Sequence, residues 1–395
     1  MANALLTPTA VTREALRILH QKLNFIGNIN RQYDSQFAVA GAKIGSTLTI
    51  RLPNQYTVRT GAAIDVQDTD EKNVLLTIAT QKGVDVEFSS VDLTLSLDDF
   101  GTRILEPMMT VLAANIESDA LSMFKDVYNQ ENNVGSSATF VGILNGRKKL
   151  VDNLAGSTNL KCNLDTQTNV DMVDVLKGLF QDSASVSKQY LEGMLGRTAG
   201  FEFFENTLMP RHVTGTDDGS GDYLANSATV QTGTSAIIDT GAGTLLKGDV
   251  FTWGSVNRVH PETKVDTGQL QQFVVTADTA VSAVLVNFEP EIIVDGAYQN
   301  VTAGIANNAI LTKVGGASAT HDISLGYSKD AFTFVTADLR LPRGLDFAAR
   351  EVMDGISMRI ITDYDITNDI FPTRIDVLYG FKTLRAQTAV RFANN

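Results

Sequence analysis

The sequence has one cysteine and four histidines among 395 residues. The single cysteine, Cys162, excludes a disulfide framework within the chain and a cluster of thiolate metal ligands. The histidines stand far apart, and none of the short spacings typical of metal ligands occurs among His20, His212, His260 and His321. Cysteine and histidine therefore indicate neither a metal centre nor thiol chemistry.

Long apolar runs are also missing. No stretch of 18 apolar residues occurs, and residues 1–11 lack the basic and apolar regions of a signal peptide. The sequence thus predicts no membrane span, and we expect synthesis in the cytoplasm. A length of 395 residues with 43% hydrophobic composition is enough for a buried core and for two or three domains.

Positive charge is scarce, since the net charge is −13. This argues against a general nucleic-acid binder, whose affinity comes largely from clustered lysine and arginine. The distribution is uneven: residues 1–60 hold seven basic and two acidic residues, whereas residues 61–100 hold two basic and nine acidic ones. Such neighbouring segments of opposite sign favour self-association between copies, although two separately solvated faces are an equally common explanation.

One stretch, residues 97–128, has the pattern of a long amphipathic helix. Apolar residues recur at every fourth position, namely Phe100, Ile104, Met108, Leu112, Ile116, Ala120, Phe124 and Tyr128. Pro107 conflicts with an unbroken helix, so the sequence predicts a kink there or a true start near Glu106. The stripe alone also fits the central core helix of an ordinary enzyme.

The remaining segments differ in period and composition. Helical spacing over residues 10–30 predicts an N-terminal helix, and residues 47–88 have the pattern of a long, polar, β-rich excursion. Residues 136–212 are mixed. Residues 213–325 carry 13 of the 31 glycines, twelve acidic against four basic residues and many short Val, Ile and Thr runs, which indicates an inserted β-barrel or sandwich. From residue 329 onward the pattern again predicts strands.

Motifs for chemistry are nearly absent. Gly241, Gly243 and Gly248 do not have the Rossmann spacing, and neither a G-x-S-x-G elbow nor a Walker lysine occurs. Two acidic turns, one with Asp217, Asp218 and Asp222 and one with Asp363, Asp365, Asn368 and Asp369, do not follow the EF-hand ligand order, so exposed turns are favoured over calcium sites. The basic patch at residues 147–149 is interpreted as a solvated helix end. An enzyme could still assemble a site from scattered carboxylates.

Several sequence blocks resemble the coat proteins of tailed bacteriophages in the Salmonella podovirus (P-twenty-two type) family. The blocks follow one another in order along nearly the whole chain and include ALRILHQKLNFIGNINRQYD, GAKIGSTLTIRLP, RTGAAIDVQDTDEKNVLLTI, QKGVDVEFSSVDLTLSLDDF, LKGDVFTWGSVN, TGQLQQFVVTA, DAFTFVTADLRLP and DITNDIFPTRIDVLYGF. The resemblance is weakest over residues 136–169 and 214–236.

The resemblance implies an α+β protein with the Hong Kong 97-like capsid fold, a long spine helix, an extended β-loop and an inserted β-barrel domain. The implied division is an N-terminal arm (1–44), the extended β-loop (45–90), a peripheral domain with the spine (91–135), the axial domain in two parts (136–212 and 326–349) around the inserted barrel (213–325), and a return to the peripheral and axial sheet (350–395).

In function, the resemblance implies a structural capsid protein without enzymatic activity or cofactor. Copies would associate into the hexamers and pentamers of a shell, with a scaffolding protein and a portal as partners during assembly in the bacterial host cytoplasm. Double-stranded DNA would be packaged in the virion without sequence-specific binding, and no membrane would be involved. The alternatives are a non-viral shell protein of the same fold and an enzyme with an unrecognised carboxylate site.

Two groups of residues follow as candidates. The charged residues of the extended loop are expected to contact neighbouring copies: Arg51, Arg59, Asp65, Asp68, Asp70 and Glu71. The apolar stripe of the spine is expected to form core: Phe100, Ile104, Met108, Leu112, Ile116 and Phe124.

Overall fold

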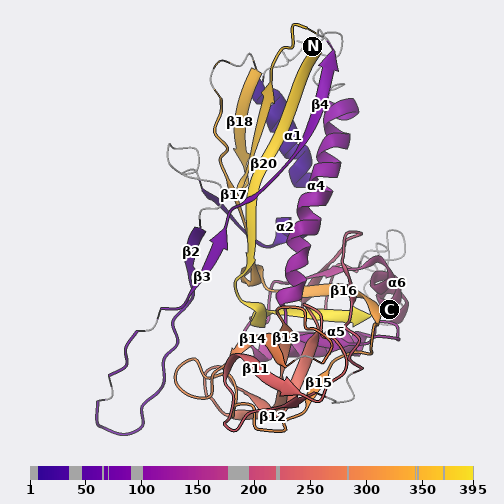
Figure 1. The fold of residues 1–395 in the computed structure, drawn as a ribbon. Coiled ribbons are helices and arrows are strands. Elements are labelled where there is room, and N and C mark those ends of the chain that lie inside the picture. The colour runs from indigo at the N-terminus through magenta and orange to yellow at the C-terminus, as the bar shows by residue number, and fades with distance from the viewer. Residues whose placement is uncertain are drawn as a thin grey trace. The chain divides into compact units, whose positions relative to one another are not determined.

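The computed structural model describes residues 8–34, 47–64, 66–69, 71–89, 101–176, 195–218, 223–282, 284–342, 344, 347–367 and 370–394 (Figure 1). The chain divides into two compact units. Unit 1 comprises residues 1–51, 73–121 and 332–384, and unit 2 comprises residues 52–72, 122–331 and 385–395. Each unit is built from segments far apart in sequence.

The N-terminal helix of unit 1 is shorter than its pattern predicted. Helix α1 spans Pro8–Lys22, and a four-residue helix α2 follows at Phe25–Asn28. Between them, the backbone N–H groups of Asn24 and Phe25 donate to the buried carboxylate of Glu117, at 2.6 and 2.9 Å. A side chain from another helix thus satisfies N–H groups at the start of α2, so the chain can break its helix there.

A six-stranded sheet forms most of unit 1, in the order β1 (Asn30–Asp34), β17 (Phe332–Ala337), β20 (Ile370–Thr383), β19 (Ile356–Thr362) and β18 (Phe347–Met353). Strand β4 (Thr80–Ser89) pairs with β20 along its whole length, in antiparallel register. The resemblance implied an extended β-loop over residues 45–90, and residues 80–89 of that range pair within this sheet.

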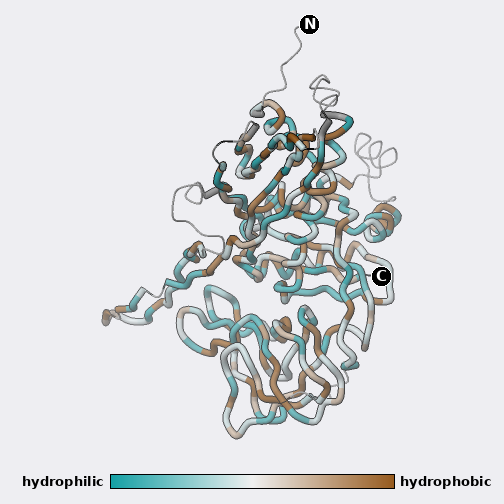
Figure 2. Tube along the Cα trace, turned by 45° about the horizontal axis from the view of Figure 1, so that its top comes forward, coloured by the Kyte–Doolittle hydropathy of each residue, from teal (hydrophilic) through white to brown (hydrophobic). Residues whose placement is uncertain are grey.

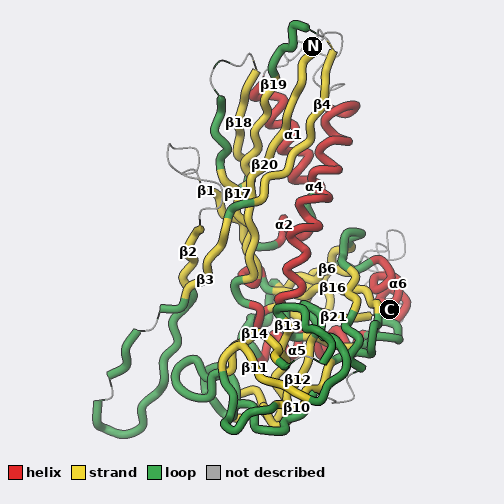
Figure 3. The backbone as a smooth tube through the Cα atoms, viewed as in Figure 1, coloured by secondary structure: helices red, strands yellow, loops and turns green. Residues whose placement is uncertain are grey.

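A two-stranded hairpin carries the rest of the predicted β excursion. Strands β2 (Thr47–Arg51) and β3 (Asn73–Thr77) pair antiparallel, and residues 52–72 between them form a long loop without described strands (Figure 3). The end of β3 passes closely over β20, where a Cβ atom on Gly380 would overlap the carbonyl oxygen of Thr77. A glycine at that position is what allows the hairpin to pack against the sheet.

The spine is an α-helix with a different helical turn at each end. A π-helical turn (Gly101–Leu105) leads into helix α4 (Glu106–Leu121), and a 3-10 turn (Ser122–Asp126) follows it. The α-helix starts at Glu106, as the alternative prediction from Pro107 had it, because proline fits the first turn, where its missing N–H has no partner to lose. At about 1.5 Å per residue, α4 is ~24 Å long, and with the turns at its two ends the helical segment covers residues 101–126 of the predicted 97–128.

In unit 2, a seven-stranded sheet runs in the order β5 (Gln130–Asn132), β21 (Ala389–Asn394), β16 (Thr320–Tyr327), β6 (Leu160–Leu164), β8 (Phe201–Glu205) and β7 (Arg197–Thr198), with β9 (Arg211–Val213) pairing with β16. Helix α5 (Phe140–Asp152) begins at Thr139, whose hydroxyl accepts from the Gly142 N–H, and α6 spans Thr166–Leu176. A Cβ atom on Gly146 of α5 would overlap the ring of Phe392, so this helix packs closely on β21.

The inserted β domain has a sheet of its own in unit 2. Its order is β10 (Leu224–Ala225), β11 (Gly233–Asp239), β14 (Leu285–Ile292), β13 (Asp266–Val275), β12 (Val250–Val259) and β15 (Leu311–Lys313). A bridge between Leu224 and Ile310 brings its first and last strands together, so the sheet nearly closes. Fully buried aromatic side chains fill it, namely Tyr223, Phe251, Trp253, Phe273 and Phe288.

The predicted α+β class, with a spine helix, an extended loop and a barrel-like insert, is therefore confirmed. The strands of the insert sheet end at Lys313, whereas β16, which begins within the predicted range 213–325 and ends at Tyr327, pairs in the seven-stranded sheet. Among the described residues, no helix is both long and apolar enough to span a membrane.

Candidate functional site

The loop of residues 52–72 is held together by local hydrogen bonds. The Leu52 N–H donates to the Lys72 carbonyl at 2.9 Å, at the base of the loop. Farther out, the Thr57 N–H donates to Gln67 Oε1 at 2.8 Å, and Gln67 Nε2 donates back to the Thr57 carbonyl at 2.6 Å. At the tip, the Arg59 guanidinium donates to the carbonyls of Gly61 and Ala63. These bonds join the two arms of the loop without a sheet or a core.

Apolar side chains of this loop are exposed. The exposed fractions are 94% for Val58, 84% for Ile64 and 85% for Val66, and Tyr56 is 58% exposed. Figure 2 shows hydrophobic and hydrophilic stretches alternating along the loop. Several large apolar side chains exposed on one short segment mark an interaction surface. The sequence reasoning drew on the charges of this segment and missed its valines and isoleucine, which the alternating runs YTVRT and AIDV could have indicated.

The predicted loop contacts have the exposure that binding to another copy needs. Arg51, Arg59, Asp68 and Glu71 are all exposed, while Asp65 and Asp70 lie outside the described residues. Next to Glu71, the ammonium of Lys72 lies 3.8 Å from a Glu291 carboxylate oxygen and 4.6 Å from the centre of the Tyr298 ring. The base of the loop is thus attached to the insert within unit 2.

The predicted spine residues lie mostly in the core. Met108, Leu112 and Ile116 of α4 are buried, and so is Phe124 in the following turn, whereas Ile104 is partly exposed. Phe100 lies outside the described residues. On the same helix Glu117 is 1% exposed and makes the two backbone contacts to α2 described above.

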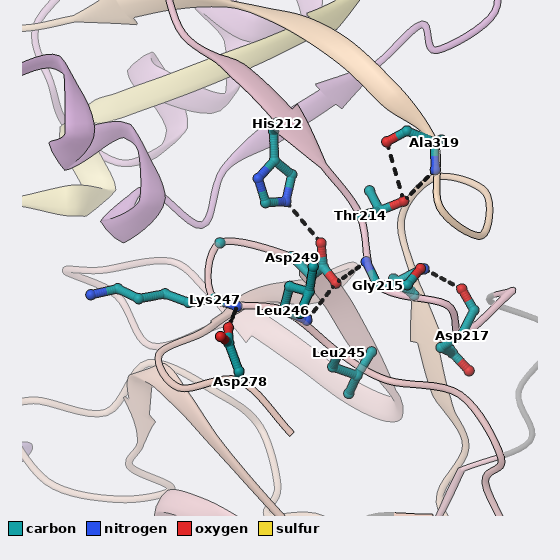
Figure 4. Close-up of polar contacts among 12 residues, drawn as sticks. His212, Thr214, Gly215, Asp217, Leu245, Leu246, Lys247, Asp249, Asp278 and Ala319 are labelled. Atoms are coloured by element: carbon teal, nitrogen blue, oxygen red, sulfur yellow. Dashed lines mark hydrogen bonds and ion pairs between the residues drawn. The ribbon is translucent and has the colours of Figure 1, made fainter. Parts of the chain in front are cut away.

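A buried polar cluster forms where the chain enters the insert, and we call it the joint. Its centre is Asp249, just before β12, whose carboxylate accepts from His212 Nε2 at 2.8 Å and from the N–H groups of Gly215 and Leu246 at 2.9 Å each (Figure 4). Burial by itself would raise the pKa of Asp249, but these three donors outweigh it and hold the pKa below its usual range. The carboxylate is therefore ionised, and both of its oxygens accept hydrogen bonds.

Further contacts surround the joint. The Lys313 ammonium donates to the carbonyls of Gly215 and Asp217, and Thr214 exchanges hydrogen bonds with the backbone of Ala319 (Figure 4). Nearby, Val250 and Val274 of the insert pack against Tyr128. The joint thus ties the start of β12 to β9, and it ties the segment after β9 to the residue before β16.

The other residues considered for chemistry have structural surroundings. Cys162 is fully buried in β6, and this burial raises the pKa of its thiol. His20 contacts Asp354 at 2.7 Å, and His260 Nδ1 accepts from the backbone of its own turn. Lys149, expected at a solvated helix end, is partly buried, and its ammonium lies 3.1 Å from a Glu131 carboxylate oxygen.

The structure describes only part of the two acidic turns that were weighed as calcium sites. Asp217 was expected in an exposed turn, but it is only 4% exposed. Its backbone N–H donates to the Thr244 carbonyl. Asp222, Asn368 and Asp369 lie outside the described residues. Within the part of the chain that the structure describes, no group of three or more His, Cys, Asp or Glu side chains could hold a metal ion.

Comparison with known proteins finds a match to a family model in the second half of the chain. Residues 210–392 match the sequence model of the family described as P22 coat protein, gene protein 5. This match extends from β9 through the insert to β21. No curated protein sequence matches the chain.

Among solved structures the chain is similar to phage and particle proteins. One is from Mycobacterium phage Che8 (11% identity, TM-score 0.45, covering 91% of this chain and 88% of that chain). Another is the mature capsid of bacteriophage PhiM1 (11% identity, TM-score 0.46, covering 94% of this chain and 87% of that chain). A third is a virus-like particle from Pyrococcus furiosus (7% identity, TM-score 0.41, covering 97% of this chain and 97% of that chain).

Proposed function

We propose that the chain is the major capsid protein of a tailed bacteriophage, because residues 210–392 match the model of the P22 coat-protein family. Copies of it assemble into the icosahedral shell of the virion. The observation that carries the proposal is the family match across the insert and the strands on both sides of it. The role is structural, and the fold is the Hong Kong 97-like capsid fold that the sequence resemblance implied.

The extended loop is the proposed contact with a neighbouring copy. Its arms are joined by local hydrogen bonds, and its valines and isoleucine are exposed, so the loop has an apolar surface to bury against a partner. Its charged residues Arg51, Arg59, Asp65, Asp68, Asp70 and Glu71 would select the orientation of that partner, because complementary charges at the rim of an interface set register more than affinity.

The finer points of the proposal follow from the resemblance. Hexamers and pentamers form with a scaffolding protein and dock on a portal in the host cytoplasm, and the shell then encloses double-stranded DNA without sequence-specific binding. The net charge of −13 supports packaging without tight DNA binding. The arm, loop, peripheral, axial and insertion domains keep the boundaries given from the sequence, except that β4 and β16 pair as described above.

Electron microscopy of particles purified from cells that produce the chain with its scaffolding partner tests this function. The proposal predicts closed icosahedral shells, and nuclease-protected double-stranded DNA in particles from infected cells. Shells that hold protein cargo and no DNA would instead support a non-viral shell protein. A soluble monomer with a catalytic activity would support the enzyme alternative and refute the capsid function.

A further inference from the structure

The joint contains a second buried histidine that capsid assembly does not explain. His321 of β16 is paired directly with His212 of β9 in the antiparallel register, and their ring centroids are 5.5 Å apart. His321 is 2% exposed, and neither ring nitrogen has a hydrogen-bond partner of normal geometry among the described residues. Buried polar atoms without partners are uncommon, so this histidine needs an explanation.

A buried arginine lies on the same side of the sheet. Arg391 of β21 is opposite Leu325 of β16, and residues 321 and 325 share a face because side chains alternate along a strand. Arg391 is fully buried, and its Nη2 donates to the Gly248 carbonyl at 2.8 Å, one residue before Asp249. Its Nε and Nη1 atoms have no partner within the described chain. Its guanidinium lies 5.8 Å from the centre of the Phe124 ring.

The charges around His321 come from each element packed against it. His212 faces it from β9, Arg391 from β21 and Asp249 from the start of β12. Asp126, in the turn after α4, acts on Arg391, and Lys313 of β15 interacts with Asp249. One carboxylate, that of Asp249, already accepts three hydrogen bonds, so a proton added to His321 would place a second cation near Arg391 without an acceptor of its own.

The position of the cluster matters as much as its chemistry. Strand β9 leads the chain into the insert and β16 leads it out, and the two pair at residues 211–213 and 320–322. The neighbouring Arg211–Asp322 ion pair, also between these strands, is exposed at its arginine. Whatever weakens the His212–His321 pair therefore weakens the attachment of the insert at both of its connections.

We propose that His212, Asp249, His321 and Arg391 form a proton-operated latch, which holds the insert on the seven-stranded sheet while His321 is neutral and releases it when His321 is protonated. Released here means that β9 and β16 separate locally and expose the His321 ring to water. The apolar packing around Tyr128 and the sheet of the insert stay in place.

The direction and size of the pH effect on the latch follow from the pKa of His321 in the closed state and in the open state. Burial, then the nearby His212 and Arg391, lower the pKa of His321 from 6.5 to about 4. The latch is therefore fully stable above pH 6.5 and loses stability as the pH falls toward 4, because the open state binds the proton more tightly. Between pH 7.5 and pH 5 the opening equilibrium should rise about 30-fold. Asp249, with its lowered pKa, keeps its charge over this range.

Hydrogen exchange of the full-length subunit tests the latch, with rates corrected for the intrinsic effect of pH. The proposal predicts that peptides covering residues 211–213 and 320–322 gain about 30-fold in opening between pH 7.5 and pH 5. The variant His321→Phe, which keeps an aromatic ring but cannot be protonated, should lose this gain. The control His260→Asn, in a turn of the insert, should keep it.

Equal acceleration in the parent and in His321→Phe would overturn the proposal, and so would the absence of acceleration in the parent. If His321→Phe does not fold, NMR of the histidine rings in the parent decides instead. A ring that titrates near pH 4 in the folded subunit, together with the faster exchange, supports the latch. A ring that titrates near 6.5 without a change in exchange refutes it.

Discussion

Replacing Ile116 by aspartate should prevent folding of the subunit. Ile116 is 1% exposed in the middle of α4. The change removes ~2–3 kcal/mol of apolar burial and places a carboxylate without a partner in the core, which adds several kcal/mol. Since the whole stability of a domain is about 5–15 kcal/mol, most of the margin is lost. The milder Ile116→Ala leaves a cavity and should cost ~2–5 kcal/mol, so it should fold with a lower midpoint.

Urea denaturation of the purified subunit, together with the yield of sedimenting particles, measures both effects. Ser118→Asp is the matched control, because it places the same charge two residues away on the exposed side of α4. The control should unfold at the same urea midpoint as the parent and give the same yield of sedimenting particles. If Ile116→Asp unfolded at the parent's urea concentration and formed particles, the spine would not be core, and the burial argument would be refuted.

Three further predictions follow from single contacts. Reversing Asp65, Asp68, Asp70 and Glu71 to lysine should leave the urea midpoint unchanged but lower particle yield, and a variant that fails to fold would place the loop in the subunit core. Glu117→Leu should cost ~2–6 kcal/mol in urea denaturation, because it leaves two backbone N–H groups without their acceptor, whereas Glu117→Gln keeps one acceptor oxygen and should cost less; equal costs would contradict this. Cys162 should not react with a thiol reagent at pH 8 until urea unfolds the subunit, since burial raises its pKa, and rapid reaction of the native subunit would show that β6 opens.

Periodicity predicted the buried side of the spine because a helix buries residues at a fixed spacing. Met108, Leu112 and Ile116 are buried at the positions that this spacing gave. Alternation likewise predicted strands that the structure contains, such as β17 and β20. The fold class that the sequence blocks implied is confirmed by the observed elements, and the match over residues 210–392 supports the family that these blocks resemble.

Strand partners could not be predicted in the same way. Alternation shows which face of a strand is buried, but it does not show that β4 pairs with β20, nearly 300 residues later. The composition of residues 213–325 indicated the insert, yet β16 alternates as well as any strand of the barrel and lies in the other sheet. Pairing depends on the tertiary fold, which no local pattern encodes.

The joint was missed for a related reason. His212, Asp249, His321 and Arg391 are separated by 37 residues or more, so they form no motif, and the histidines were assigned no chemistry. Folding brings them together because β9, β16 and β21 are neighbours in one sheet and Asp249 lies where the chain enters β12. A single histidine in a sequence indicates no function by itself. A buried pair of histidines on two paired strands, in contrast, points to a candidate titrating site.

A cryo-electron microscopy reconstruction of the assembled particle tests the central claim most directly. The account predicts a closed icosahedral shell in which the loop of residues 52–72 lies against a neighbouring copy and buries Val58, Ile64 and Val66. A particle in which this loop contacts its own subunit alone, or a sample without closed shells, would contradict it.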